Sequence, residues 1–234
     1  MTVVNQYMCQ TRSGRYLDYS NPTPEMFTIE DIAIGLSREC RFSGQTSLTH
    51  SVAAHSVLVS LVVPKEYALM GLMHDGSKAF MRDISTPLKR LLPDYRKYEE
   101  LMQDAVYAMV GIRNVTEEQS RVIKEGDMKI FATERKILMT NDNREWPDGK
   151  DHLPLSVTVG GMAEREAYEY FMDRYDSIIN DRPFEKEMDL WKAQHNDWLL
   201  RNSHMSQSAP KAMGASTQSV NQDSRGKSRQ RVAA

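Results

Sequence analysis

The sequence is poor in cysteine, in long apolar runs and in net charge, and each shortage excludes a class of protein. Cys9 and Cys40 are the only cysteines in 234 residues. They are too few for a disulfide framework and lack zinc-binding spacing, so we expect reduced thiols. The longest apolar run, "VLVSLVV" (57–63), is far shorter than the roughly 20 residues that span a bilayer. A formal net charge of −2 gives no global signal for nucleic acid or membrane binding.

The N-terminal segment "MTVVNQYMCQTRSGR" has no basic region followed by a long apolar stretch, so no signal peptide is predicted. We therefore expect a soluble, intracellular protein that has no membrane partner. A hydrophobic content of 40% and a charged content of 26% are ordinary for such a protein.

Strand-like alternation is nearly absent, and "LSVTVG" (155–160) is the one candidate strand. Apolar residues instead recur at helical spacing, as in "TIEDIAIGLSREC" (28–40), where Thr28 is a candidate N-cap. The predicted helices span residues 28–40, 46–63, 64–80, 94–111, 116–140, 162–180 and 184–200. These patterns predict an all-α fold.

The chain divides into three parts by composition. Residues 1–182 form the predicted helical domain, and residues 183–202 form an added C-terminal helix whose apolar residues pack on that domain or on another subunit. Residues 203–234 contain no aromatic residue and cannot bury enough surface to order themselves. We expect this tail to be disordered. Its five basic residues, Lys211, Arg225, Lys227, Arg229 and Arg231, leave weak polyanion binding as an alternative.

Histidine and aspartate recur on predicted helices in otherwise apolar surroundings. His55 lies on one helix, His74 and Asp75 end the next, and Asp127 lies among apolar residues of the long helix 116–140. Any one of these residues alone is most simply a hydrogen-bonded polar side chain. Together they offer the imidazole and carboxylate ligands that a divalent cation prefers.

Four stretches that contain these residues resemble, in order, one branch of the HD-domain metal-dependent phosphohydrolases. The branch holds bacterial 5′-deoxynucleotidases and phage-encoded deoxynucleoside triphosphate hydrolases, such as the dATP triphosphohydrolases. The resemblance covers about residues 11–140, and the matching stretches are "TRSGRYLDYSNPTPEMFTIEDIAIGLSRECRFSGQT" (11–46), "SVAAHSVLVS" (51–60), "ALMGLMHDGSKAFMRDISTPLKRLLPDY" (68–95) and "VIKEGDMKIFATERKILM" (122–139). It implies an HD-domain helical bundle over residues 1–182.

The resemblance also implies roles for individual residues. The implied metal ligands are His55, His74, Asp75 and Asp127. The implied substrate-binding residues are Arg41, Phe42, Lys89 and Lys124, where basic groups offset phosphate charge. Asp83 is implied to act near the metal-bound water or the sugar. His50, where the branch usually has an aromatic or unrelated residue, is expected to support the site indirectly or to lie on the surface.

Lys78 departs from the branch, which usually has glutamate four residues after the HD histidine, credited with acid–base or water-orienting work. A lysine cannot replace it as a base unless its pKa falls by several units. Three interpretations stay open. Lys78 binds the substrate phosphate while Asp83 handles the water, it points away from the site, or it marks a chain that binds nucleotides without hydrolysing them. We expect retained activity because all metal ligands persist.

The expected function is therefore metal-dependent hydrolysis of a deoxynucleoside triphosphate to deoxynucleoside and triphosphate. The alternatives are a 5′-deoxynucleotidase that acts on monophosphates, a catalytically impaired nucleotide-binding protein, and, less well matched, a cyclic-nucleotide or oligonucleotide phosphodiesterase. The ligand set suits Mn²⁺, Co²⁺, Fe²⁺, Zn²⁺ or Mg²⁺ without selecting one. Relatives in the branch are often oligomers, so a homo-oligomer is expected, in the cytoplasm or in the host cytoplasm if a phage encodes it.

Overall fold

The computed structural model describes residues 4–140, 144, 146–155, 157 and 159–184. The predicted C-terminal helix, apart from its first two residues, and the predicted tail lie outside the described residues. Within the described part of the chain, no helix is both long enough and apolar enough to cross a membrane.

The described chain is mostly helical, which confirms the predicted all-α fold class. Its only sheet among the described residues is a short antiparallel hairpin in which Cys9 pairs with Leu17. The elements are β1 (Met8–Gln10), β2 (Tyr16–Asp18), α1 (Ile29–Arg38), α2 (Val52–Val62), α3 (Ala68–Met73), α4 (Lys78–Met81), α5 (Thr86–Lys89), α6 (Pro93–Met109), α7 (Glu117–Leu138) and α8 (Glu164–Ile179). Three single 3₁₀ turns, Pro24–Met26, Arg41–Gly44 and Lys65–Tyr67, connect them.

Helix α2 forms the centre of the bundle. Its residues from Val52 to Ser60 are all buried, and it packs against α1, α3, α7 and α8. A helix that is apolar on every side must be surrounded by other elements. Two clusters of buried side chains lie around it, one toward α1, α6 and α8 and one toward α7. His55 is therefore held in the middle of the molecule.

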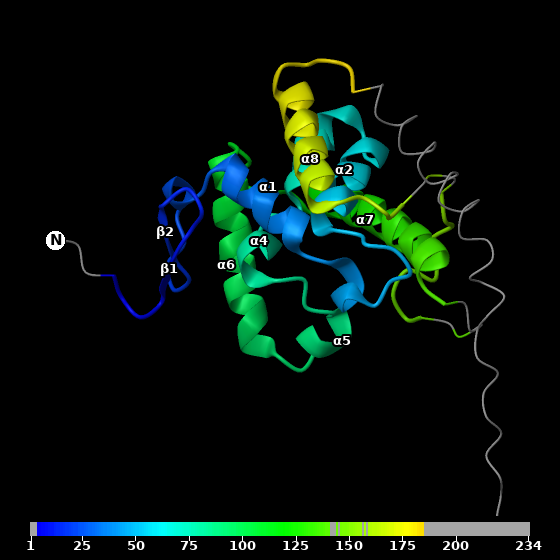
Figure 1. Cartoon of the computed structure of the whole chain (residues 1–234), viewed down its shortest axis with the longest axis horizontal. Coiled ribbons are helices and arrows are strands. Elements are labelled where there is room, and N and C mark those ends of the chain that lie inside the picture. The colour runs from blue at the N-terminus through cyan, green and yellow to red at the C-terminus, as the bar shows by residue number, and fades with distance from the viewer. Residues whose placement is uncertain (1–3, 141–143, 145, 156, 158, 185–234) are drawn as a thin grey trace, which may run out of the picture.

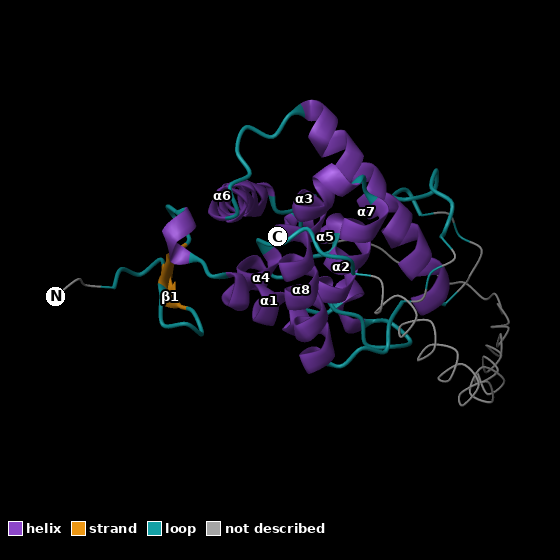
Figure 2. Cartoon of the chain, turned by 90° about the horizontal axis from the view of Figure 1, so that it is seen from above, coloured by secondary structure: helices purple, strands orange, loops and turns teal. Residues whose placement is uncertain are grey.

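The hairpin lies at one side of the helical body and α7 lies at the other (Figures 1 and 2). Leu17 anchors the hairpin because its side chain is fully buried in the larger core cluster. Asp31 adds a polar contact, accepting hydrogen bonds from the backbone and side chain of Ser13 at 2.9 and 2.6 Å. The sequence patterns did not predict these strands.

Helix α2 begins later than the predicted 46–63 range. Ser51 caps it by accepting a hydrogen bond from Ala54 N, as N-cap serines commonly do. The residues before it pair with the segment after α1 instead of continuing the helix, because Arg41 N donates to His50 O at 2.9 Å and Val52 N donates to Glu39 O at 2.9 Å. This pairing brings Arg41 and His50 to the same end of the core.

The predicted helix 64–80 is broken into a 3₁₀ turn, α3 and α4. A turn follows Met73, where Gly76 N donates to Met73 O at 2.9 Å. Helix α4 then packs on α1 so closely that a Cβ added at Gly35 would lie 2.7 Å from Ala79 Cβ. The break matters for function because it places His74 and Asp75 on a turn and aims Lys78 back at them.

The predicted strand at 155–160 is wrong for the residues that are described, since Leu155, Val157, Val159 and Gly160 have no strand conformation. Val159 is nonetheless fully buried and belongs to the cluster near α7. The apolar residues Leu155, Val157 and Val159 instead pack on the cluster near α7.

Candidate metal centre

Polar and charged side chains gather where four parts of the chain meet inside the bundle. His55 comes from α2, His74 and Asp75 from the turn after α3, Asp127 from α7, and Asp83 from the segment after α4. His55 is fully buried, and the other four side chains are between 8% and 16% exposed. The structure thus brings together all four predicted metal ligands and the predicted Asp83.

Both imidazole rings turn Nε2 toward the middle of the cluster. His55 Nδ1 donates to the Glu134 carboxylate at 2.6 Å, and His74 Nδ1 donates to the carbonyl oxygen of Gly71 at 2.7 Å. Acceptors on Nδ1 leave Nε2 as the ligand atom in each ring, the arrangement that second-shell partners give metal-bound histidines. The two Nε2 atoms face one another at 3.3 Å.

Two carboxylate oxygens lie beside the imidazole nitrogens. Asp75 Oδ2 lies 3.7 Å from His55 Nε2 and 3.4 Å from His74 Nε2. Asp127 Oδ1 lies 3.3 Å from His55 Nε2 and 4.0 Å from His74 Nε2. Atoms bound to one ion at roughly 2.0–2.2 Å can be at most about 4.4 Å apart, and each of the two carboxylate oxygens lies within that distance of both imidazole nitrogens. His55, His74 and Asp75 form a group that could hold a metal ion.

Glu134 connects the centre to its surroundings, although the sequence patterns did not identify it. Its side chain is fully buried. One oxygen, Oε1, lies 2.7 Å from His50 Nε2 and 2.6 Å from His55 Nδ1, and the other, Oε2, accepts from Arg41 Nη2 and Nε at 3.0 and 3.3 Å. His50 is therefore buried beside the site and supports it through Glu134, one of the two placements expected for it.

A signal for Glu134 was present in the sequence. It lies seven residues after Asp127, which is two turns of α7 and hence the same face of the helix. The same face carries the fully buried Ile130 and the 1% exposed Leu138. A carboxylate at a core position of an amphipathic helix needs a cationic or hydrogen-bonding partner.

Arg41 and Lys78 supply the positive charge of the cluster. Arg41 Nη1 lies 3.4 Å from Asp83 Oδ2. The Lys78 ammonium lies 2.8 Å from Asp75 Oδ2 and 2.6 Å from Asp83 Oδ1, with its side chain only 11% exposed. These contacts contradict the interpretation in which Lys78 points away from the site.

In this cluster, burial shifts the pKa of a charged side chain in one direction and the neighbouring opposite charges shift it in the other. Burial lowers the pKa of Lys78, but Asp75 and Asp83 outweigh it and raise the pKa above its usual value. Burial likewise raises the pKa of Glu134, yet Arg41 and the histidines hold it well below the usual value. The neighbours of Lys78 thus favour its ammonium form, and those of Glu134 favour its carboxylate form.

Two other predicted substrate-binding residues, Lys89 and Phe42, make their contacts with side chains other than the four predicted metal ligands. Lys89 forms an ion pair with Glu99, so its charge is already matched there. Phe42 stacks on Phe131 with ring centroids 5.6 Å apart, and the Arg41 guanidinium lies 5.5 Å from its ring centre. Phe42 adopts a left-handed φ of 52°, a conformation that costs energy in a bulky residue and that often occurs at functional sites.

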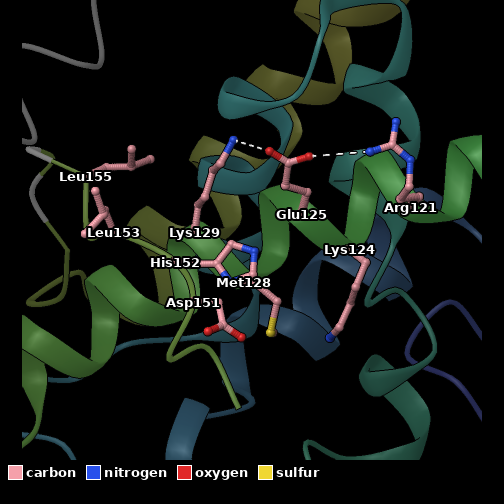
Figure 3. Close-up of a pocket in the computed structure, with 9 residues that line it drawn as sticks. All are labelled: Arg121, Lys124, Glu125, Met128, Lys129, Asp151, His152, Leu153 and Leu155. Atoms are coloured by element: carbon pink, nitrogen blue, oxygen red, sulfur yellow. Dashed lines mark hydrogen bonds and ion pairs between the residues drawn. The ribbon is translucent and has the colours of Figure 1, made fainter. Parts of the chain in front are cut away.

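Lys124 stands at the border between the centre and an outer groove. Its Nζ lies 2.9 Å from Asp127 Oδ2, and its side chain is 65% exposed. Figure 3 shows it among the residues that line a groove of about 730 Å³ between α7 and the segment after it. The lining residues are Arg121, Lys124, Glu125, Met128, Lys129, Asp151, His152, Leu153 and Leu155.

Two known proteins are similar to this chain over most of its length. YfdR, an uncharacterized protein of Escherichia coli (strain K12), is 38% identical over 171 residues, which cover 72% of this chain and 94% of YfdR. RCAP_rcc00048, an uncharacterized protein of Rhodobacter capsulatus, is 34% identical over 164 residues, which cover 65% of this chain and 83% of that protein. No family model matches the chain.

Proposed function

The chain belongs to the family of YfdR, and we propose that it is a divalent-metal-dependent phosphohydrolase that acts on deoxynucleotides. One observation carries the proposal. Two buried imidazole nitrogens face each other at 3.3 Å with the carboxylate oxygens of Asp75 and Asp127 beside them, and a divalent cation is the group that satisfies all four. The resemblance to the HD-domain phosphohydrolases supplies the reaction class.

His55, His74, Asp75 and Asp127 would hold the ion. When bound, such an ion lowers the pKa of a bound water and polarises a phosphoryl oxygen. Asp83 is the side chain proposed to orient the water and accept its proton. Its two oxygens lie against Lys78 and Arg41 at 2.6 and 3.4 Å, and these cations keep the carboxylate in one orientation.

The proposed reaction transfers a phosphoryl group to water. The water oxygen forms a bond to the α-phosphorus, the bond from that phosphorus to the 5′ oxygen breaks, and the 5′ oxygen takes up a proton. The products are a deoxynucleoside and triphosphate. Arg41 and Lys78 would offset the charge on the phosphate oxygens, and the exposed face of Phe42 would contact the sugar or base.

The length of the phosphate chain that the site can hold depends on how many basic side chains contact it. Lys124 stands free enough to contact a distal phosphate, because it is 65% exposed and adjoins the groove that also holds Arg121 and Lys129. Both lysines are paired, Lys124 with Asp127 and Lys89 with Glu99, but the Lys89 side chain is only 16% exposed. An exposed Lys124 within reach of a distal phosphate favours triphosphates. A Lys89 whose charge is already matched favours the alternative, a 5′-deoxynucleotidase, which needs fewer cations.

A nucleotide-binding protein without hydrolysis is the second candidate, and Lys78 is the observation that favours it. An ammonium that is paired with Asp75 and Asp83 cannot do the acid–base work of the glutamate that the HD-domain branch usually has there.

Product analysis separates these functions. The purified full-length chain is incubated with Mn²⁺, Co²⁺ or Mg²⁺ and with a panel of deoxynucleoside triphosphates, monophosphates and cyclic nucleotides, and products are resolved by chromatography. We expect metal-dependent release of triphosphate, lost in His55→Ala and Asp127→Asn. Glu169→Gln, an exposed change on α8, is the control. Nucleotide binding without turnover under any metal would contradict hydrolysis.

A further inference from the structure

The chain turns sharply at Arg82, between helix α4 and Asp83, the residue proposed to orient the water. Arg82 has a φ of 75° and a ψ of 158°. This combination is almost confined to glycine, because a side chain at positive φ crowds its own backbone. A bulky residue keeps such a conformation only where its surroundings hold it there.

Two side chains hold the peptide that joins Arg82 to Asp83. Glu39 Oε1 accepts from the N–H of this peptide, on Asp83, at 3.0 Å. The Tyr95 hydroxyl donates to its carbonyl oxygen, on Arg82, at 3.2 Å, and to the preceding Met81 carbonyl at 2.9 Å. Because both polar groups of the peptide are bound, its plane is fixed.

Glu39 also contacts the Arg82 side chain. Its second oxygen, Oε2, accepts from Arg82 Nη1 at 2.8 Å. The Glu39 side chain is 13% exposed and that of Arg82 is 75% exposed, so solvent weakens this ion pair. The hydrogen bond to the Asp83 backbone is therefore the contact that matters for the turn.

The segment from Glu39 to Arg41 grips Asp83 at both ends. Glu39 and Cys40 have extended backbone conformations, and alternate residues of an extended chain point to the same side. Glu39 and Arg41 therefore both face Asp83. Glu39 binds its backbone N–H, and Arg41 Nη1 lies 3.4 Å from its Oδ2.

The turn decides where the Asp83 carboxylate points. Its Oδ1 lies 2.6 Å from the Lys78 ammonium, and its side chain is 9% exposed. If Arg82 relaxed to an ordinary φ near −65°, the chain after it would rotate by roughly 140°. The Asp83 carboxylate would then leave Lys78 and Arg41.

We propose that Glu39 is a positioning residue for Asp83. By accepting from the peptide N–H, it holds Arg82 at positive φ and so keeps the Asp83 carboxylate in the site. This role rests on the proposed function, because it acts through Asp83, but the position of Asp83 can be measured without turnover. Glu39 was not among the site residues predicted from the sequence.

Two substitutions at position 82 test whether the turn is strained. Arg82→Ala and Arg82→Gly both remove the guanidinium and differ chiefly in how easily the residue adopts positive φ. Glycine also makes the unfolded chain more flexible, which opposes the gain. We expect a net folding equilibrium constant at least about fivefold larger for Arg82→Gly in urea unfolding. An alanine variant as stable as the glycine variant would overturn the inference, and both variants keep Glu39.

Crystal structures of variants at position 39 show the position of Asp83 directly. Glu39→Ala removes both oxygens, whereas Glu39→Gln keeps one that can accept from the Asp83 N–H. We expect the Asp83 carboxylate to lie beyond hydrogen-bond distance of Lys78 in Glu39→Ala and within it in Glu39→Gln. It should return in Glu39→Ala/Arg82→Gly, since glycine at position 82 needs no support. An unmoved Asp83 in Glu39→Ala would overturn the inference.

Glu164→Ala is the matched control. Glu164 accepts from Arg38, the residue before Glu39, at 2.7 Å, and both side chains are about half exposed. The variant thus loses a neighbouring ion pair without touching the turn at Arg82. We expect Asp83 to stay in place, and the same displacement as in Glu39→Ala would overturn a specific role for Glu39.

Turnover separates this inference from the proposed function. In Glu39→Ala we expect kcat to fall at least about tenfold, since a positioned base contributes about 10²–10⁴-fold, and KM to change by less than about threefold. Arg82→Gly should restore most of kcat in the double variant, which a merely destabilised protein would not regain. Unchanged kcat in folded Glu39→Ala, or a loss that Arg82→Gly leaves in place, would overturn the inference. A wild type that hydrolyses no nucleotide would refute the proposed function, while unfolding and crystallography would still decide whether Glu39 positions Asp83.

Discussion

Glu134→Gln offers the sharpest test of how the centre is held, because the change keeps the shape of the side chain and removes its charge. The two carboxylate oxygens divide their partners. Oε1 faces two imidazole nitrogens, of His50 and His55, and Oε2 faces two nitrogens of Arg41. An amide has only one oxygen, so its NH₂ group must face either the imidazoles or the guanidinium, and donors then meet donors.

The cost follows from burial. Glu134 is 0% exposed and the Arg41 side chain 9%, so solvent cannot replace the lost charge. Breaking a buried ion pair from one side costs about 3–5 kcal/mol, and loss of a group that orients a metal-binding histidine weakens metal affinity by about 10–100-fold. We therefore expect Glu134→Gln to lower the free energy of unfolding by about 3–5 kcal/mol.

Two measurements check this expectation. Urea unfolding in the presence of a chelator gives the loss of stability without metal, and titration with Mn²⁺ gives the loss of affinity. The control is Glu169→Gln, in which an exposed partner of Arg165 is neutralised at an expected cost below about 0.5 kcal/mol. A Glu134→Gln variant with the same unfolding midpoint and the same Mn²⁺ affinity as the wild type would refute the reasoning.

Three further predictions concern stability. Gly35→Ala should destabilise the fold by about 1–3 kcal/mol in urea unfolding, because the added Cβ would lie 2.7 Å from the backbone oxygen of Ala79 and overpacking is costly; an unchanged midpoint would contradict it. Burial raises the pKa of Asp31, but hydrogen bonds led by those from Ser13 outweigh it and lower the pKa below 3.8. Stability from the charged form is thus complete above the pKa of the unfolded chain, about 3.9, and is lost as pH falls through the lower folded value. Asp31→Asn should therefore cost about 1 kcal/mol near pH 7, with a gap in unfolding curves that narrows as pH falls below the unfolded value; a gap that does not narrow with acidification would refute the pairing. Finally, Mn²⁺ at 100 times its dissociation constant should add about 2.7 kcal/mol to the free energy of unfolding in wild type but not in His55→Ala, and equal effects in both would place the ion elsewhere.

The sequence predicted most helices because their apolar residues recur on one side. Helix α7 was expected over 116–140 and runs over Glu117–Leu138. Thr116 caps its N-terminus. The break after α3 was missed, since a helical pattern cannot register that the backbone turns at Gly76. The hairpin was missed as well, because three-residue strands are too short to show alternation.

The sequence predicted the side chains that meet at the candidate centre but not Glu134, which links them to Arg41 and His50. His55, His74, Asp75 and Asp127 lie together as expected. Glu134 was overlooked because its partners are 79 to 93 residues away, and spacing along one helix cannot reveal a contact at that distance. The proposed roles of these residues stay predictions until metal binding and turnover are measured.

The long reach of Glu134 has a consequence for how the molecule folds. Its carboxylate joins Arg41, His50 and His55 from the first quarter of the chain to a helix near residue 134. Contacts between such distant segments form late, because closing the loop between them costs entropy that only the packed core repays. The proposed ligand set therefore stays incomplete until α7 docks, because Asp127 and the Glu134 that contacts His55 both lie on that helix. Tight binding of the proposed ion would then report that the whole helical core has formed.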